Sequence, residues 1–314
     1  MEQLVQILPS PHQKKSLKER LENFAVSNTD VKDIKILVSG QNGAGKSSFM
    51  NSVNSAFQGE IVSEALANAT FGHSFTRRAQ QAHGEIPQGN EARTGSIQPP
   101  SDQVVLPEGL TLHCVMNTSY HIKKSETEDL PYCLIDIKGL EPDALAVVQS
   151  NDIINTIRGH VKENYEFKGD QQLTPEDVEY YKKDADISDQ AFCLVYIMPA
   201  NFAGSTNQQT IEQIKIIRKE ISYDRIPQVI VMTKVDEACP LVKDDLRKIY
   251  TSRKIKQKME ECSVDVGVPI SNIFPVKNYH IETDTNDDVD VLILKAFDQI
   301  VRSANARLRR GAFK

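Results

Sequence analysis

Residues 40–47 of the chain read Gly40-Gln41-Asn42-Gly43-Ala44-Gly45-Lys46-Ser47, which matches the phosphate-binding pattern G-x-x-x-x-G-K-[ST]. Average residue usage produces this pattern by chance in on the order of one chain in a hundred of this length. The context strengthens the match, because the apolar run Ile34 to Val38 before it is typical of a buried strand. Ser47 to Phe57 after it carries apolar residues at helical spacing. A strand, a glycine-rich turn and a helix in this order predict a P-loop.

The residue types of this loop suit the phosphates of a nucleotide. Glycines let backbone N–H groups approach phosphate oxygens closely, and the following helix places the positive end of its dipole at the same point. Lys46 is expected to reach the β- and γ-phosphates, a catalytic as well as a binding role, and Ser47 to coordinate Mg²⁺. The predicted phosphate-binding residues are Asn42, Gly43, Ala44, Gly45, Lys46, Ser47 and Ser48.

A second motif, Asp136-Ile137-Lys138-Gly139, follows the apolar run Tyr132 to Ile135. In P-loop proteins an acidic residue that ends the neighbouring strand completes the Mg²⁺ shell, and a glycine just beyond it senses the γ-phosphate. We therefore predict Asp136 as a metal ligand and Gly139 as part of the catalytic apparatus. Leu140 follows, where many signalling GTPases carry a glutamine that orients the attacking water. Because leucine cannot hydrogen-bond water, we expect slow hydrolysis, or hydrolysis completed by a residue supplied elsewhere.

Base selection depends on Thr233-Lys234-Val235-Asp236. The K-x-D core occurs four times, but only this copy follows an apolar run like Gln228 to Met232, which places it at the carboxyl end of a strand. Asp236 can accept hydrogen bonds from the guanine N1–H and N2–H₂ groups, which adenine does not supply, and the stem of Lys234 can lie along the base. We predict that Thr233, Lys234 and Asp236 select guanine, so that GTP or GDP is the ligand; ATP is the alternative.

The loop after the next short strand is a weaker candidate for contact with the base. It reads Phe274-Pro275-Val276-Lys277-Asn278 and begins some forty residues after the guanine motif. We predict that Val276 and Lys277 contact the base there, and this prediction depends only on their position after a short strand.

A threonine from the segment between the first helix and the acidic strand end is expected to bind Mg²⁺ when GTP is present. Thr76 is our choice, and Thr70 and Thr94 are its rivals. Arg77 and Arg78 are candidates for an arginine finger, within the molecule or across a homodimer, although solvated loop arginines are more common.

Outward from these motifs, strand-like and helix-like segments alternate along the chain. Strands are expected at 34–38, 111–120, 132–137, 191–198, 228–233 and 273–276, and helices at 47–57, 144–157, 206–221 and 289–308, with a helical region at about 241–261. This alternation predicts an α/β fold of three layers, a P-loop GTPase fold (G domain) with a mainly parallel sheet. The two consecutive strands 111–120 and 132–137 predict one antiparallel edge strand.

The G domain is expected to have helices at both ends. Leu17, Leu21 and Phe24 at helical spacing predict an amphipathic N-terminal helix. Residues 82–108 are rich in Gly, Pro, Gln, Asn and Ser, and loops of such length are usually functional or disordered. The expected organisation is an N-terminal helix and linker at 1–30, the G domain at 31–310 with a mobile loop at about 77–110, and a tail at 311–314.

Composition limits the classes of function. The 314 residues carry a net charge of −6, which argues against bulk nucleic-acid binding. No apolar run approaches the ~20 residues of a membrane span, and no signal-peptide core follows Met1. We therefore expect no transmembrane segment and a cytoplasmic protein. The cysteines are odd in number and never spaced C-x-x-C, which favours a reducing compartment over disulfides or zinc. They are Cys114, Cys133, Cys193, Cys239 and Cys262.

Several stretches together resemble one known family. They are Gly43 to Phe49 running into Asn51-Ser52-Val53, Asp136 with Gly139-Leu140-Glu141, Arg158-Gly159-His160-Val161 leading to Tyr165 and Phe167, Thr233 to Asp236, and Ile273 to Tyr279. With these, residues 30 to 308 resemble the interferon-induced protein 44 family of GTP-binding proteins. The resemblance implies a cytoplasmic, immune-induced protein with antiviral or antiproliferative roles.

The leading hypothesis is a slow Mg²⁺-dependent GTPase or a GTP-dependent switch. Nucleotide state would then reorder residues 60–110 and the segment after Gly139 and so alter a surface for a protein partner or a homodimer. The alternative is a non-hydrolysing scaffold that holds GTP as a structural ligand. Leu140 favours the scaffold, and both hypotheses require the P-loop and Asp136.

Overall fold

The structure is a computed structural model of the chain. It describes residues 11–65, 117–125, 127–137, 139–140, 146–167, 171–201 and 208–310. Thr70, Thr76, Thr94, Arg77, Arg78, the loop at 77–110 and the tail at 311–314 lie outside the described residues, as do 111–116 of the predicted strand 111–120.

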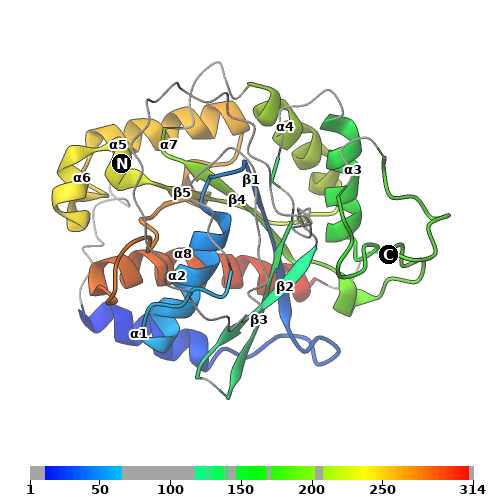
Figure 1. Cartoon of the computed structure of the whole chain (residues 1–314), viewed down its shortest axis with the longest axis horizontal. Helices are drawn as coiled ribbons and strands as arrows, with labels where there is room; N and C mark the ends of the chain where they lie inside the picture. The colour runs from blue at the N-terminus through cyan, green and yellow to red at the C-terminus, as the bar shows by residue number, and fades with distance from the viewer. Residues whose placement is uncertain are drawn as a thin grey trace, which may run out of the picture.

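The described part of the chain forms one sheet covered by helices (Figure 1). The strands are β1 (Ile34–Gly40), β2 (Thr118–Lys123), β3 (Asp129–Asp136), β4 (Cys193–Pro199), β5 (Gln228–Thr233) and β6 (Ile273–Pro275). The α-helices are α1 (Pro11–Glu22), α2 (Lys46–Gln58), α3 (Ala146–Ile157), α4 (Gln208–Tyr223), α5 (Val235–Ala238), α6 (Pro240–Asp244), α7 (Arg253–Val266) and α8 (Asp287–Leu308). Short 3₁₀ helices are η1 (Ile187–Asp189), η3 (Leu246–Lys248) and η4 (Ile270–Asn272).

The sheet has the order β2-β3-β1-β4-β5-β6, and β2 is its antiparallel edge strand. The other strands run parallel, so their carboxyl ends meet at one edge of the sheet. The central strand β1 lies between β3 and β4, with Val38 opposite Asp136 and Gly40 opposite Ile197. Gly40 is required there, because a Cβ at this position would lie 2.3 Å from the Ile197 carbonyl oxygen. The predicted three-layer α/β fold with a mainly parallel sheet and one antiparallel edge is confirmed.

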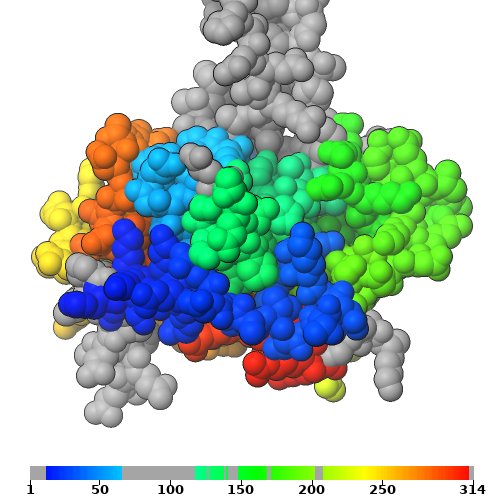
Figure 2. All heavy atoms as spheres, turned by 90° about the horizontal axis from the view of Figure 1, so that it is seen from below, coloured from blue at the N-terminus to red at the C-terminus, as the bar shows by residue number. Residues whose placement is uncertain are grey.

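Two groups of helices cover the two faces of the sheet (Figure 1). On one face α1 packs against α8, and α8 packs against α2; on the other α4 packs against α3 and α7. The predicted amphipathic helix is α1, whose Leu17 and Leu21 are buried while Phe24 lies just beyond its end. Tyr132 of β3 donates a hydrogen bond to the Leu21 carbonyl at 2.8 Å. Its ring packs edge-on against Phe297 of α8, with 5.2 Å between the ring centroids. In the space-filling view, α1 lies along this face beside α2 and α8 (Figure 2).

The helical region expected at about 241–261 is present, but it is divided into three elements. The chain forms α6, η3 and α7 there, because two side chains interrupt it by binding backbone N–H groups. Asp245 accepts from the Arg247 N–H and starts η3, and Ser252 accepts from the Ile255 N–H and starts α7. Such local caps compete with a continuous helix. None of the helices in the described part of the chain has both the length and the apolar character needed to cross a bilayer.

Candidate functional site

Four of the predicted motifs meet at the carboxyl edge of the sheet. β1 ends at Gly40 in the phosphate loop, β3 ends at Asp136, β5 ends at Thr233, and β6 is followed directly by Val276. Parallel pairing in the order β3-β1-β4-β5-β6 brings these ends together from distant parts of the sequence. This edge is where ligands bind in open α/β sheets.

The phosphate loop has the backbone conformation that an anion site requires. Gly43 and Gly45 have φ angles of +73° and +96°, in the left-handed region that favours glycine. Gly45 precedes the first residue of α2 and has no side chain to cap the helix. The first N–H groups of any helix have no intrahelical acceptor, so the start of α2, at Lys46 to Ser48, is a suitable place for an anion. Together with the dipole of this 13-residue helix, they attract negative charge.

Lys46 lies across this loop with its side chain buried to 7% exposure. Its ammonium donates hydrogen bonds to the carbonyl oxygens of Gly40 at 3.2 Å and Gln41 at 3.3 Å. A phosphate group is a stronger acceptor than either carbonyl because it is charged. The ammonium is thus held at the loop by weak bonds that a phosphate can replace.

Asp136 is the buried acid of the site, with 3% of its surface exposed. Burial raises the pKa of its carboxyl from the ordinary 3.8 to about 6, although the charge of Lys46 and hydrogen bonds from the Ile137 N–H and the Ser47 hydroxyl oppose this rise. Its Oδ1 atom is buried and has no hydrogen-bond partner among the described residues. A buried carboxylate oxygen without a donor, beside a serine hydroxyl, fits a hard divalent cation such as Mg²⁺.

Gly139 contacts the phosphate loop from the segment that follows β3. A Cβ at Gly139 would lie 2.1 Å from Asn42 Oδ1 and 3.0 Å from the Asn42 backbone nitrogen, so a larger residue here would require Asn42 to move. The Gly139 carbonyl accepts a hydrogen bond from Gln149 Nε2 of α3 at 3.0 Å, and Gln149 in turn accepts one from Gln213 of α4 at 3.3 Å. Gln149 is absent from the predicted site. Gln149 lies four residues before the buried Ile153, so the helical spacing places its polar side chain on the buried face of α3. This spacing could have marked Gln149 as a buried polar residue.

The segment predicted to select the base is joined to the phosphate loop. Thr233 is fully buried, and its hydroxyl donates to the Ala44 carbonyl at 2.7 Å. Lys234 follows with a left-handed backbone, φ 56°, and α5 begins at the next residue. Asp236 lies in the first turn of α5 and is partly buried. The side chains of Lys234 and Asp236 thus leave the strand end beside the phosphate loop, and their contacts with a base stay predictions.

The loop after β6 makes a second junction with the phosphate loop. Val276 is fully buried, and its N–H donates to the Met232 carbonyl at 2.8 Å, so this N–H continues the sheet and its contact with the base stays a prediction. Lys277 forms an ion pair with Glu282. Asn278, which is not in the predicted set, donates from Nδ2 to the Gly45 carbonyl at 3.1 Å.

Comparison with known proteins confirms the resemblance to the interferon-induced protein 44 family. The chain is 25% identical over 276 residues to human interferon-induced protein 44-like, covering 88% of the chain and 52% of that relative. It is 26% identical over 290 residues to mouse interferon-induced protein 44, covering 92% and 59%. It is 27% identical over 293 residues to the human protein of that name, covering 93% and 57%. The chain thus spans a little over half the length of these curated relatives.

No family model matches the chain. Among solved structures, a probable GTP-binding protein engB has a TM-score of 0.40 at 9% identity and covers 87% of this chain and 99% of its own. A structure on dimerization and GTPase activity of the chloroplast translocon components atToc33 and psToc159 has a TM-score of 0.42 at 12% identity. The match covers 93% of this chain and 89% of that one.

Proposed function

We propose that this chain binds GTP and GDP together with Mg²⁺ at the carboxyl edge of the sheet. The observation that carries the proposal is the 2.7 Å hydrogen bond from Thr233 to Ala44. It holds the segment predicted to select the base against the loop predicted to bind phosphates. A nucleotide, with a base at one end and phosphates at the other, is the ligand that could contact both.

Each side chain of the site then has a chemical task. Lys46 neutralises the β- and γ-phosphates, and the Ser47 hydroxyl and the Asp136 carboxylate hold Mg²⁺, which supplies positive charge to the phosphate oxygens. Thr76 is proposed as the third protein ligand of the metal, and it lies outside the described residues. Asp236 accepts from the guanine N1–H and N2–H₂ groups, and an adenine would leave this carboxylate without donors.

Turnover is proposed to be slow. Leu140 is buried at 1% exposure, and its N–H donates to the Gly40 carbonyl at 3.0 Å, so its side chain belongs to the core. A buried leucine does not orient an attacking water, which leaves two modes of action. One is a GTP-dependent switch with low intrinsic hydrolysis, completed by a homodimer or another protein partner; the other is a scaffold that keeps GTP bound.

The proposed cellular role is inferred from the similar proteins. Proteins named interferon-induced protein 44 match nine tenths of this chain, and this supports a role in the interferon response. The more specific proposal is an antiviral role in the cytoplasm.

Binding of fluorescent GDP, GTP and ATP analogues by purified protein tests the nucleotide and the base. Lys46→Ala should abolish binding, and Asp236→Asn should reduce the preference for guanine over adenine by at least about tenfold. Asp184→Asn is the matched control, because Asp184 is exposed and ends another K-x-D copy. An Asp236→Asn variant that keeps full guanine preference would contradict the assignment.

Single-turnover hydrolysis of GTP at several protein concentrations separates the two modes of action. A rate that rises with protein concentration indicates a GTPase completed by self-association. Bound GTP that persists without turnover at every concentration indicates the scaffold.

A further inference from the structure

The loop after β6 is fastened to the phosphate-binding element at two consecutive residues. Asn278 donates from its side chain to the Gly45 carbonyl at 3.1 Å, and the Tyr279 N–H donates to Ser52 Oγ of α2 at 2.9 Å. Ser52 itself donates to the Ser48 carbonyl at 2.7 Å. Both attachments therefore end on the loop and first turns that would carry the phosphates.

The first attachment is close enough to constrain the phosphate loop. A Cβ at Gly45 would lie 2.9 Å from Asn278 Nδ2, so the amide occupies the space beside this glycine. Because the Gly45 carbonyl can only accept, the amide must present its nitrogen. Its Oδ1 is buried without a hydrogen-bond partner among the described residues, so the Gly45 contact is the one that holds this amide in place.

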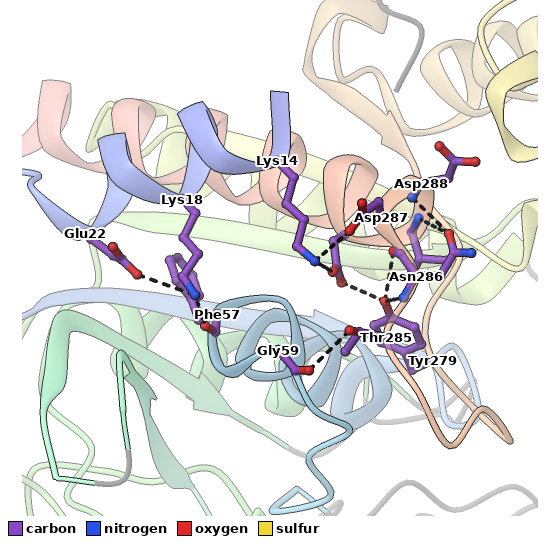
Figure 3. A network of polar contacts seen from close by, with 12 residues as sticks. Lys14, Lys18, Glu22, Phe57, Gly59, Tyr279, Thr285, Asn286, Asp287 and Asp288 are labelled. Carbon is purple, nitrogen blue, oxygen red and sulfur yellow. Dashed lines mark hydrogen bonds and ion pairs between the residues drawn. The ribbon is translucent and has the colours of Figure 1, made fainter. Parts of the chain in front are cut away.

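The second attachment is rigid because Tyr279 is held at its other end as well. The Tyr279 hydroxyl donates to Asp290 Oδ1 at 2.7 Å and accepts from the Asn286 N–H at 2.7 Å, at the start of α8 (Figure 3). Lys14 of α1 pairs with the other oxygen of Asp290 at 2.7 Å. Tyr279 is thereby fixed to α2 and to the start of α8, so the Asn278–Gly45 bond is the contact that joins the rest of the loop to the phosphate loop itself.

We propose that Asn278 is a positioning residue for the nucleotide site: it holds the loop 276–279 against the phosphate loop and so sets how long a guanine nucleotide stays bound. The inference rests on the proposed function. Asn278 acts through the Gly45 carbonyl and needs no contact with the ligand. A nucleotide that spans both loops binds best when their separation is already correct, since ordering them on binding would oppose affinity. Loss of such an arrangement appears mainly in the dissociation rate.

The test is the dissociation rate of a fluorescent GDP analogue, measured by chase with unlabelled GDP, for the full chain and its Asn278→Ala variant. The expected rise is about fivefold, the factor that the net contribution of one neutral hydrogen bond gives. Asn272→Ala is the matched control: Asn272 donates from Nδ2 to the Gln228 carbonyl at 3.3 Å, just before β6 and at the opposite edge of the sheet. It removes the same kind of bond and should leave the rate unchanged.

The thermal midpoint of each nucleotide-free variant is measured alongside, because a merely structural role would lower the midpoint and leave the rate alone. If Asn278→Ala does not fold, Asn278→Ser replaces it, since the serine hydroxyl ends one bond short of the amide nitrogen and keeps a polar group there. Faster release by the Asn278 variant alone supports the proposal. An unchanged rate, or equal acceleration by Asn272→Ala, overturns it while guanine binding stands. A wild-type chain that binds neither GDP nor GTP removes the proposed function and this inference together.

Discussion

Asp136→Asn is expected to make the nucleotide-free protein more stable at neutral pH while removing its Mg²⁺-dependent binding of GTP. The carboxylate is buried, and its Oδ1 atom has no hydrogen-bond partner among the described residues. Burial of the ionised carboxylate destabilises the folded state by more than the nearby charge of Lys46 offsets, and a metal ion bound at Asp136 would offset the remainder. Asparagine is neutral and similar in size, so it removes the charge and keeps the packing.

The magnitude follows from the pKa. Burial raises the pKa of Asp136 from 3.8 to about 6, so between these values the folded state holds a proton that the unfolded state has lost. The free energy of unfolding of the wild type therefore falls as pH rises through this range, and above pH 6 the full penalty of about 3 kcal/mol applies. The advantage of the variant should be largest at pH 7.5, up to about 3 kcal/mol, and shrink to about 1 kcal/mol near pH 4.5.

Urea unfolding followed by circular dichroism, in EDTA and after removal of nucleotide, measures this difference at both pH values. Asp152→Asn is the control for the loss of an acceptor: burial raises the pKa of Asp152 as well, but its carboxylate accepts from the Tyr165 hydroxyl at 3.0 Å and the Leu173 N–H at 2.8 Å. An asparagine there loses an acceptor for one of these donors and should destabilise by roughly 1–3 kcal/mol. A lower stability of Asp136→Asn than of the wild type at pH 7.5, or an advantage that does not depend on pH, would show that burial of the charge does not destabilise the protein.

Lys14→Met should lower the free energy of unfolding by roughly 2–4 kcal/mol, because it leaves the fully buried carboxylate of Asp290 without its cation. Lys15→Met is the control, because the Lys15 side chain is 80% exposed, and it should change the free energy of unfolding by less than about 0.5 kcal/mol. Equal effects of the two variants in urea unfolding would contradict the role given to Lys14. Gly139→Ala should weaken GTP binding roughly tenfold and GDP binding less, because its methyl group would press on Asn42 of the phosphate loop and Gly139 is the residue predicted to sense the γ-phosphate. Gly59→Ala is the control: its Cβ would meet no atom within 4 Å, and the positive φ of Gly59 should lower stability without changing the affinity for GTP or GDP. Titration with fluorescent GTP and GDP analogues measures both affinities. An unchanged GTP affinity in Gly139→Ala would contradict the proposed place of Gly139 beside the nucleotide.

Much of the fold was predictable because its signals are local. The run Ile34 to Val38, the glycines of the phosphate loop and the apolar spacing of residues 47–57 each specify a conformation within a few residues, and β1 and α2 match them closely. The helical region expected at 241–261 is present, but the apolar spacing did not show that it is divided, because that spacing continues through residues that stop a helix. Asp245 and Ser252 bind nearby N–H groups, and this competition is visible only once the backbone has turned.

The candidate site was predictable where a residue type is tied to one chemistry, as with Lys46 and Asp136. Gln149 and Asn278 were not, because glutamine and asparagine occur at many surface positions and nothing near them in the sequence marks a partner. Their partners, the carbonyls of Gly139 and Gly45, become available only when α3 and β6 are placed.

The amino-acid sequence by itself determined the phosphate loop, the order of strands and helices, and the residue types that suit phosphate, metal and guanine. These depend on backbone preferences and side-chain spacing within one element, which short stretches of chain already contain. Only the tertiary structure decided that Thr233 is bonded to Ala44 across 189 residues and Asn278 to Gly45 across 233. It also decided that Asp136 is buried with a raised pKa, because desolvation is produced by the surrounding elements together. Strand order brings such groups together, and strand order arises from burying the faces of all the elements at once.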